Sequence, residues 1–111
     1  MKTILIDPKE RSFTEIEHDN SDYKNISKAL DCDLFDVVRL KDCDIYVDDE
    51  GLYNSEYFFI IEGIDQPLAG RGLVFGVVDE EGNDTPCTLN VEDLEKRVQF
   101  ATRHDLMKEL F

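Results

Sequence analysis

Two short motifs, each with three consecutive acids directly before a glycine, are the strongest candidate functional residues of this chain. Val47 to Asn54 reads VDDEGLYN, and Val78 to Asp84 reads VDEEGND. Carboxylates at this density can bind a hard cation, shape a turn or present negative charge to a basic partner. The candidate acidic interaction face consists of Asp48, Asp49, Glu50, Asp79, Glu80, Glu81 and Asp84.

The spacing of the two motifs excludes the EF-hand calcium loop, which needs Asp at its first position and Gly at its sixth. With Gly51 or Gly82 at the sixth position, the first position falls on Tyr46 or Val77. We therefore predict no metal site, although a looser cation site between the two motifs stays open. Acids before a glycine after an apolar run are typical of a hairpin with a type I turn and a bulge, in which the glycine takes a positive φ. We expect two such hairpin turns.

A second candidate is the segment Gly70-Arg71-Gly72, whose arginine is the single cation among residues 42–84. Backbone N–H groups together with a guanidinium can bind a phosphate or a carboxylate. The segment lacks both the GxGxxG pattern before a helix and the Walker A pattern, so it is no dinucleotide or NTP fingerprint. It predicts an anion-binding site; the alternative is a loop in which Arg71 pairs with a nearby acid.

Catalytic residues are not indicated. His18 and His104 have acidic neighbours, but no metalloprotease, nucleophile-elbow or Cys-His pattern surrounds them. Cys32, Cys43 and Cys87 are odd in number, lie far apart and form no CxxC, so three reduced cysteines in or near the core are expected. We therefore expect a protein without catalytic activity, metal or cofactor.

The net charge of −14 is concentrated in one part of the chain, because residues 42–84 hold twelve acids and one base and thus carry −11. Such a field repels nucleic acids and anionic membranes and attracts cationic surfaces. The expected partner is therefore a basic protein surface, with no direct binding of nucleic acid or membrane.

The length of 111 residues predicts a single α+β domain over residues 1–111. Apolar runs are far shorter than the roughly 20 residues of a transmembrane helix, and no signal-peptide pattern is present. We expect a cytoplasmic location. The hydrophobic pattern predicts strands at residues 2–6, 11–17, 35–40, 44–47, 57–61, 73–78 and 86–89.

Two helices complete the predicted fold. A short helix of about nine residues should follow the first hairpin, with Asn20-Ser21 as its N-cap. A C-terminal helix should begin after Asn90 with Asp93 completing a capping box, and carry its apolar face through residues 98–101 to a kink at 103–105. The fold class is thus a small, mainly antiparallel β-sheet with these two helices. The C-terminal helix is also a candidate surface for a homodimer.

Two longer stretches, FDVVRLKDCDIYVDDEGL and PLAGRGLVFGVVDEEGND, resemble a small family of domains of unknown function. That family is common in phages, plasmids and their bacterial hosts. The resemblance covers most of residues 2–89. It implies a mobile element inside a bacterial cell as the setting, and it brings no activity and no catalytic residue.

These observations lead to two hypotheses from different classes. The first is an acidic interaction protein, in its narrowest form a phage- or plasmid-encoded inhibitor that mimics nucleic acid towards a basic host protein. The second is a small-ligand module that binds a nucleotide or another anion at Gly70-Arg71-Gly72. If the acids of residues 42–84 do not share one face, the mimic loses its main support.

Overall fold

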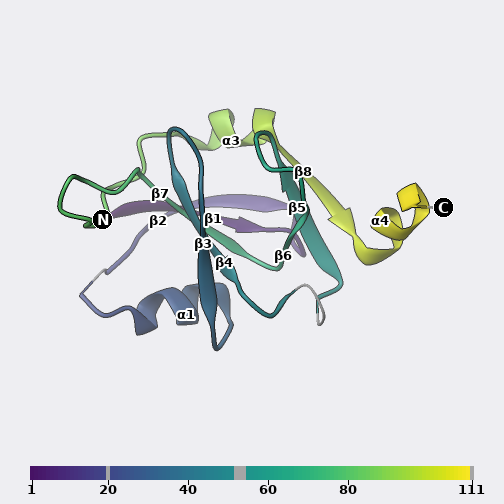
Figure 1. Cartoon of the computed structure of the whole chain (residues 1–111), viewed down its shortest axis with the longest axis horizontal. Coiled ribbons are helices and arrows are strands. Elements are labelled where there is room, and N and C mark those ends of the chain that lie inside the picture. Colours follow the sequence, from purple (N-terminus) through teal and green to yellow (C-terminus); the bar gives the residue numbers. More distant parts are fainter. Residues whose placement is uncertain (20, 52–54, 111) are drawn as a thin grey trace.

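Two antiparallel sheets form the framework of the protein (Figure 1). The computed structural model describes residues 1–19, 21–51 and 55–110. The large sheet has five strands in the order β2 (Ser12–Glu17), β1 (Lys2–Asp7), β7 (Gly72–Phe75), β4 (Asp44–Asp48) and β3 (Phe35–Arg39). The small sheet has three, in the order β6 (Leu68–Ala69), β5 (Tyr57–Ile61) and β8 (Val98–Thr102). With helices α1 (Lys24–Leu30), α3 (Val91–Arg97) and α4 (Arg103–Leu110), the predicted α+β class is confirmed.

Alternation along the large-sheet strands gives each face of that sheet its own apolar layer. Ile4, Ile45 and Val74 face the small sheet and pack with Phe59, whereas Leu73 and Phe75 face the opposite way. On that opposite face α1 covers the sheet through Ile26 and Leu30. Burial of each large apolar side chain contributes about 1.5–3 kcal/mol, so the two layers supply most of the cohesion of the fold.

The two sheets approach each other closely at Gly72. A Cβ at this position would lie 2.7 Å from Cζ of Phe59, a distance that no real side chain tolerates. Because position 72 is a glycine, the ring of Phe59 on β5 can lie directly on β7, in the middle of the large sheet.

The predicted hairpin at the N-terminus is confirmed. β1 and β2 pair from Lys2↔Glu17 to Asp7↔Ser12, and the carboxylate of Asp7 accepts hydrogen bonds from the backbone N–H groups of Lys9 and Glu10. Local turn chemistry therefore sets the register of these two strands.

The predicted C-terminal helix is wrong in its middle part, because residues 98–102 form β8 and separate α3 from α4. Its start is confirmed: the side chain of Asn90 accepts from the N–H of Asp93, and the carboxylate of Asp93 accepts from the N–H of Asn90. Val98 then takes an extended conformation, and β8 pairs with β5. The apolar residues of VQFAT fit the period of a helix as well as that of a strand. The strand forms because the edge of β5 is free to pair with it.

Three smaller predictions are also corrected. α1 begins at Lys24 behind Tyr23, whose side chain makes no capping bond; the proposed cap at Ser21 is not used, and Asn20 lies outside the described residues. β7 ends at Phe75, before the expected end at Val78. Residues 86–89 form no strand, since Pro86 has no N–H, although Cys87 donates to the carbonyl of Lys2.

The two long sides of this sheet pair differ. On one side α3 packs against β2 and β8, and the rings of Phe13 and Phe100 lie 5.2 Å apart. On the other side the edge strands β3 and β6 border the gap between the sheets. In the described part of the chain, no helix is long and apolar enough to cross a membrane.

Candidate functional site

The first acidic motif, Asp48 to Glu50, connects the two sheets rather than closing a hairpin. Asp48 ends β4 in the large sheet, and the next strand, β5, belongs to the small sheet. The predicted hairpin with a positive φ at Gly51 is therefore wrong: the described glycines with positive φ are Gly63, Gly70 and Gly82. Gly51 instead serves close packing, because a Cβ there would lie 3.0 Å from Cβ of Ala69. Residues 52–54 of the stretch VDDEGLYN lie outside the described residues.

Further acids lie beside the first motif. The N–H of Asp49 donates to the carbonyl of Leu34, which ties the motif to the loop between α1 and β3. Burial, followed by the negative charges of Asp48, Asp33 and Asp31, raises the pKa of Cys32 to about 11. Asp31 and Asp33 were missed by sequence reasoning, because only the contact between the α1–β3 loop and β4 brings them next to Asp48.

The second acidic motif, Asp79 to Asp84, forms the predicted turn, but residues 76–79 and 83–90 on either side of it form no strand, so the predicted hairpin is wrong in its strands. The N–H of Gly82 donates to the carbonyl of Asp79, the N–H of Asp79 donates to the carbonyl of Asn83, and Gly82 has φ +83°. The carboxylate of Asp79 accepts from the N–H groups of Asn83 and Glu81 at 2.9 Å each. These bonds, that from Asn83 first, lower the pKa of Asp79, so this acid stabilises the turn while Glu80 and Glu81 face solvent.

Asp84 anchors the second motif to the core. Its carboxylate accepts a 2.8 Å hydrogen bond from the hydroxyl of Tyr46 on β4. The rings of Tyr46 and His18 both stand edge-on to Phe75. His18 is 6% exposed, and its Nε2 has no hydrogen-bond partner among the residues that the structure describes. Burial, followed by the N-terminal ammonium, lowers the pKa of His18.

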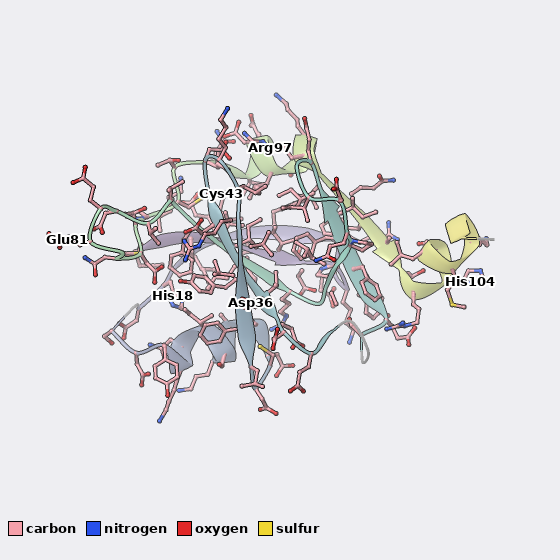
Figure 2. All side chains as sticks on the ribbon, in the orientation of Figure 1. His18, Asp36, Cys43, Glu81, Arg97 and His104 are labelled. Carbon is pink, nitrogen blue, oxygen red and sulfur yellow. The ribbon has the colours of Figure 1, made fainter. Side chains whose placement is uncertain are left out.

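The two acidic motifs lie in different parts of the molecule. Glu81 is at the left-hand end of the molecule in Figure 2, whereas β4, which ends at Asp48, lies near the middle of Figure 1. The motifs therefore do not form one compact cluster. Among the described residues, no group of three metal-ligating side chains is close enough to hold a metal ion.

The ion pairs of the protein use other acids. Within residues 1–19, 21–51 and 55–110, the pairs are Asp42 with Arg97, Asp44 with Arg39, Asp7 with Arg71, Glu56 with Arg103, and Glu17 with the N-terminal ammonium. None of the seven carboxylates of the acidic interaction face takes part in these pairs. Their charge is compensated by turn amides, by the Tyr46 hydroxyl or by solvent.

The segment Gly70-Arg71-Gly72 does not form the expected cradle of free amides. The N–H of Gly70 donates to the carbonyl of Tyr57, and Gly72 lies inside β7. Nε of Arg71 lies 3.6 Å from the carboxylate of Asp7, and Nη1 donates to the carbonyl of Ala29 at 3.4 Å. Arg71 thus pairs with an acid, as the alternative interpretation expects, and this long ion pair together with the long bond to the Ala29 carbonyl leaves further guanidinium donors for a ligand.

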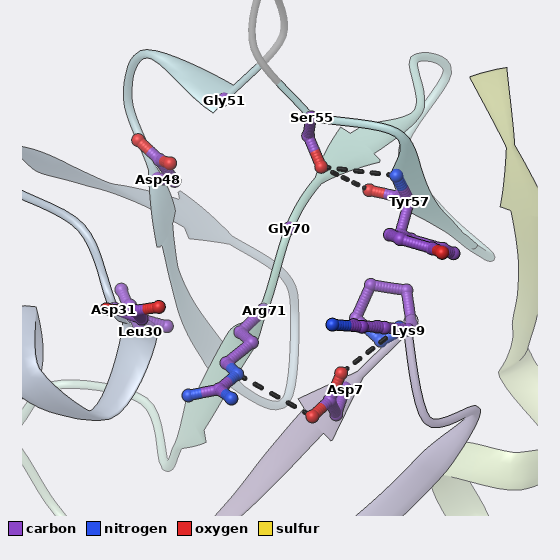
Figure 3. A pocket seen from close by; sticks show the side chains of 11 residues that line it. Asp7, Lys9, Leu30, Asp31, Asp48, Gly51, Ser55, Tyr57, Gly70 and Arg71 are labelled. Carbon is purple, nitrogen blue, oxygen red and sulfur yellow. Dashed lines mark hydrogen bonds and ion pairs between the residues drawn. The ribbon is translucent and has the colours of Figure 1, made fainter.

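Arg71 nevertheless borders a cleft of about 320 Å³ (Figure 3). The cleft brings the first acidic motif and the Gly70-Arg71 segment together, two features that are distant in sequence. Its charged side chains are the cations Lys9 and Arg71 and the acids Asp7, Asp31 and Asp48; Tyr57 lies on the opposite wall from Asp31. This mixture of charges fits a ligand with both anionic and cationic groups better than a pure anion.

Comparison with known proteins yields one match. The family model described as "Domain of unknown function (DUF3846)" matches residues 1–99. No curated protein and no solved structure matches the chain. The match includes both acidic motifs and the Arg71 cleft, and it ends inside β8, before α4.

Proposed function

The chain belongs to the DUF3846 family of domains of unknown function, and we propose that it is a non-catalytic interaction protein that binds a basic protein surface. The observation that supports this most is the absence of ion pairs at all seven carboxylates of the acidic interaction face, within the described residues. Unpaired acids in a chain of charge −14 attract cationic partners and speed up association with them.

The nucleic-acid mimic is the narrower form of this proposal, and the arrangement of the acids counts against it. The longest dimension of the protein is 45 Å, over which duplex DNA carries about 26 phosphate charges. The protein has a net charge of −14, so a mimic needs most of its acids on one face. The separation of the two motifs instead favours a partner with two distinct basic patches, consistent with an inhibitor of a nucleic-acid-binding host protein but not restricted to one.

Affinity capture from a bacterial lysate at low and high salt tests the proposal. A fourfold variant replaces acids of the face: Asp49→Asn, Glu50→Gln, Glu80→Gln and Glu81→Gln. A matched control removes the same charge from exposed acids elsewhere: Glu10→Gln, Glu15→Gln, Glu92→Gln and Glu95→Gln.

We expect a basic protein to be captured at about 50 mM salt and lost at about 500 mM, because salt screens exposed charges. The face variant should lower the affinity of the purified partner on the order of tenfold or more, and the control much less. Equal capture by wild type and face variant, or capture that is independent of salt, contradicts the proposal.

A second candidate function rests on the Arg71 cleft, whose volume lies at the lower end of the range for small-ligand pockets. We propose a thermal-shift screen with nucleotides, inorganic phosphate and amino acids, using wild type and Arg71→Ala. At a concentration of 100 Kd a ligand adds about 2.7 kcal/mol to the free energy of unfolding. No shift of wild type by any compound, or an equal shift of both proteins, contradicts a ligand role for Arg71.

A further inference from the structure

The side of the molecule that α3 leaves uncovered contains a groove. It lies between the edge of the large sheet at β3 and the edge of the small sheet at β6, and its volume is about 340 Å³. The residues that line it come from three segments: Asp36 and Val38; Val47, Asp48 and Asp49; and Gln66, Pro67, Leu68 and Ala69.

The groove has an apolar floor and an acidic rim. In the β3–β4 register Asp36 lies opposite Val47, so both side chains are on the face that looks towards the small sheet. Val47 and Leu68 are buried in the core, and Val38 packs against them, which makes the floor. Asp36 and Asp49 are exposed at the rim, and Asp48 is half-buried.

The charges of the groove distinguish it from the neighbouring Arg71 cleft, with which it shares Asp48. Its lining includes three carboxylates and no cation, and none of the three forms an ion pair with another described residue. The groove is thus complementary to a group that is both cationic and partly apolar. Lys and Arg are such groups, because their stems can lie on an apolar floor while their charges stay in contact with acids and water.

We propose that this groove binds a short basic segment of a partner protein, in which an apolar residue lies between lysines or arginines. The inference rests on the proposed function and names the place and chemistry of its principal contact. The apolar residue fills the space over Val38, Val47 and Leu68, and the flanking cations reach Asp36 and the first acidic motif.

Three capped peptides with matched lengths test the proposal by NMR on the ¹⁵N-labelled full chain. Gly-Lys-Leu-Lys-Gly has both required features, Gly-Lys-Ser-Lys-Gly lacks the apolar residue, and Gly-Glu-Leu-Glu-Gly has the opposite charge. We expect the first to bind at least fivefold more tightly than either control. Its shift changes should cluster at residues 36–38, 47–49 and 66–69.

Two variants with equal loss of charge locate the contact. Asp36→Asn with Asp49→Asn should weaken binding of Gly-Lys-Leu-Lys-Gly tenfold or more. Glu80→Gln with Glu81→Gln, in the second acidic motif, should leave its Kd within twofold. The comparison among the three peptides does not depend on any variant and decides the question even if a variant folds poorly.

The outcomes separate the groove from the broader proposed function. Three outcomes contradict the proposal that the groove binds a basic segment. They are equal binding of the two lysine peptides, shift changes centred on the second acidic motif, and no binding of any peptide. If the basic partner is still captured in a salt-dependent way, the proposed function survives that result. If the peptide binds the groove as expected but no basic protein is captured, the inference stands and the proposed function in its present form fails.

Discussion

At the scale of single residues, His18 combines burial with an orphan nitrogen. Burial has the largest effect on the pKa of His18 and lowers it, and the N-terminal ammonium lowers it further. The carboxylates of Asp19 and Asp84 raise this pKa, but by less, so that it is lowered overall. An unfolded chain binds this proton near pH 6.5, and the native chain only at lower pH. The stabilisation by neutral His18 is therefore complete above the unfolded pKa and is lost as the pH falls below 6.5 towards the native pKa.

We predict that His18→Phe, which keeps an aromatic ring beside Phe75, reduces the pH dependence of stability. The free energy of unfolding from urea titrations should fall more steeply between pH 7 and pH 5 in wild type than in the variant. Identical slopes for the two proteins contradict a buried neutral histidine.

The hydrogen bond between Tyr46 and Asp84 gives a second prediction at this scale. Tyr46→Phe removes the donor to a half-buried carboxylate and should destabilise the protein by about 1–2 kcal/mol. Amide hydrogen exchange at residues 77–85 should speed up as well, because the loop loses its anchor. Asp79→Ala serves as a comparison, because it removes the turn's carboxylate but leaves the bond between Tyr46 and Asp84 intact. In this variant we expect faster amide exchange only at residues 79–83.

At the scale of elements, local sequence predicts what is determined locally. The β1–β2 hairpin, the Asn90 capping box and the turn at Gly82 follow from residues within a few positions of one another. The strand at residues 98–102 and the sheet-to-sheet connection after Asp48 do not, because both depend on which strand edges are free once the sheets assemble. The Arg71 cleft and the β3–β6 groove could not be predicted for the same reason, as each combines residues from several segments.

The two acid-glycine motifs look alike in sequence but should respond differently to substitution. Gly82→Ala forces an alanine to a positive φ and should cost about 1 kcal/mol, and Gly82→Asn should restore most of it, because Asn tolerates that conformation. Gly51→Ala and Gly51→Asn should both cost roughly 1–3 kcal/mol, because any Cβ meets Ala69 and Asp48. Thermal unfolding of the four variants measures these losses of stability. If Gly51→Asn is clearly more stable than Gly51→Ala, close packing around Gly51 is not the reason for the glycine.

At the scale of the whole molecule, the net charge should make stability depend on salt. With −14 charges and few internal ion pairs among the described residues, the native protein repels itself at low ionic strength. Raising NaCl from about 20 to 500 mM should increase the free energy of unfolding on the order of 1 kcal/mol. A decrease with salt would mean that ion pairs outweigh repulsion.

The role of α4 is also testable at this scale. Apart from Arg103, which contacts Ser55 and Phe58, α4 packs mainly against the preceding strand, and Met107 is 51% exposed. If the helix mediates a homodimer, as the sequence suggests, deletion of residues 104–111 should convert the dimer to a monomer in sedimentation. At low protein concentration this deletion should change the melting temperature little. If the wild-type protein is itself monomeric in sedimentation, the dimer prediction is wrong.

The position of β7 in the large sheet has a consequence for how the chain folds. β7 lies between the β1–β2 hairpin and the β3–β4 hairpin, yet it follows both in sequence by more than twenty residues. During synthesis the two hairpins are complete early, and each has one strand edge without its partner until residues 72–75 leave the ribosome. Closure of such long loops is slow compared with hairpin formation, so the nascent chain passes through an interval in which chaperones and proteases can recognise it.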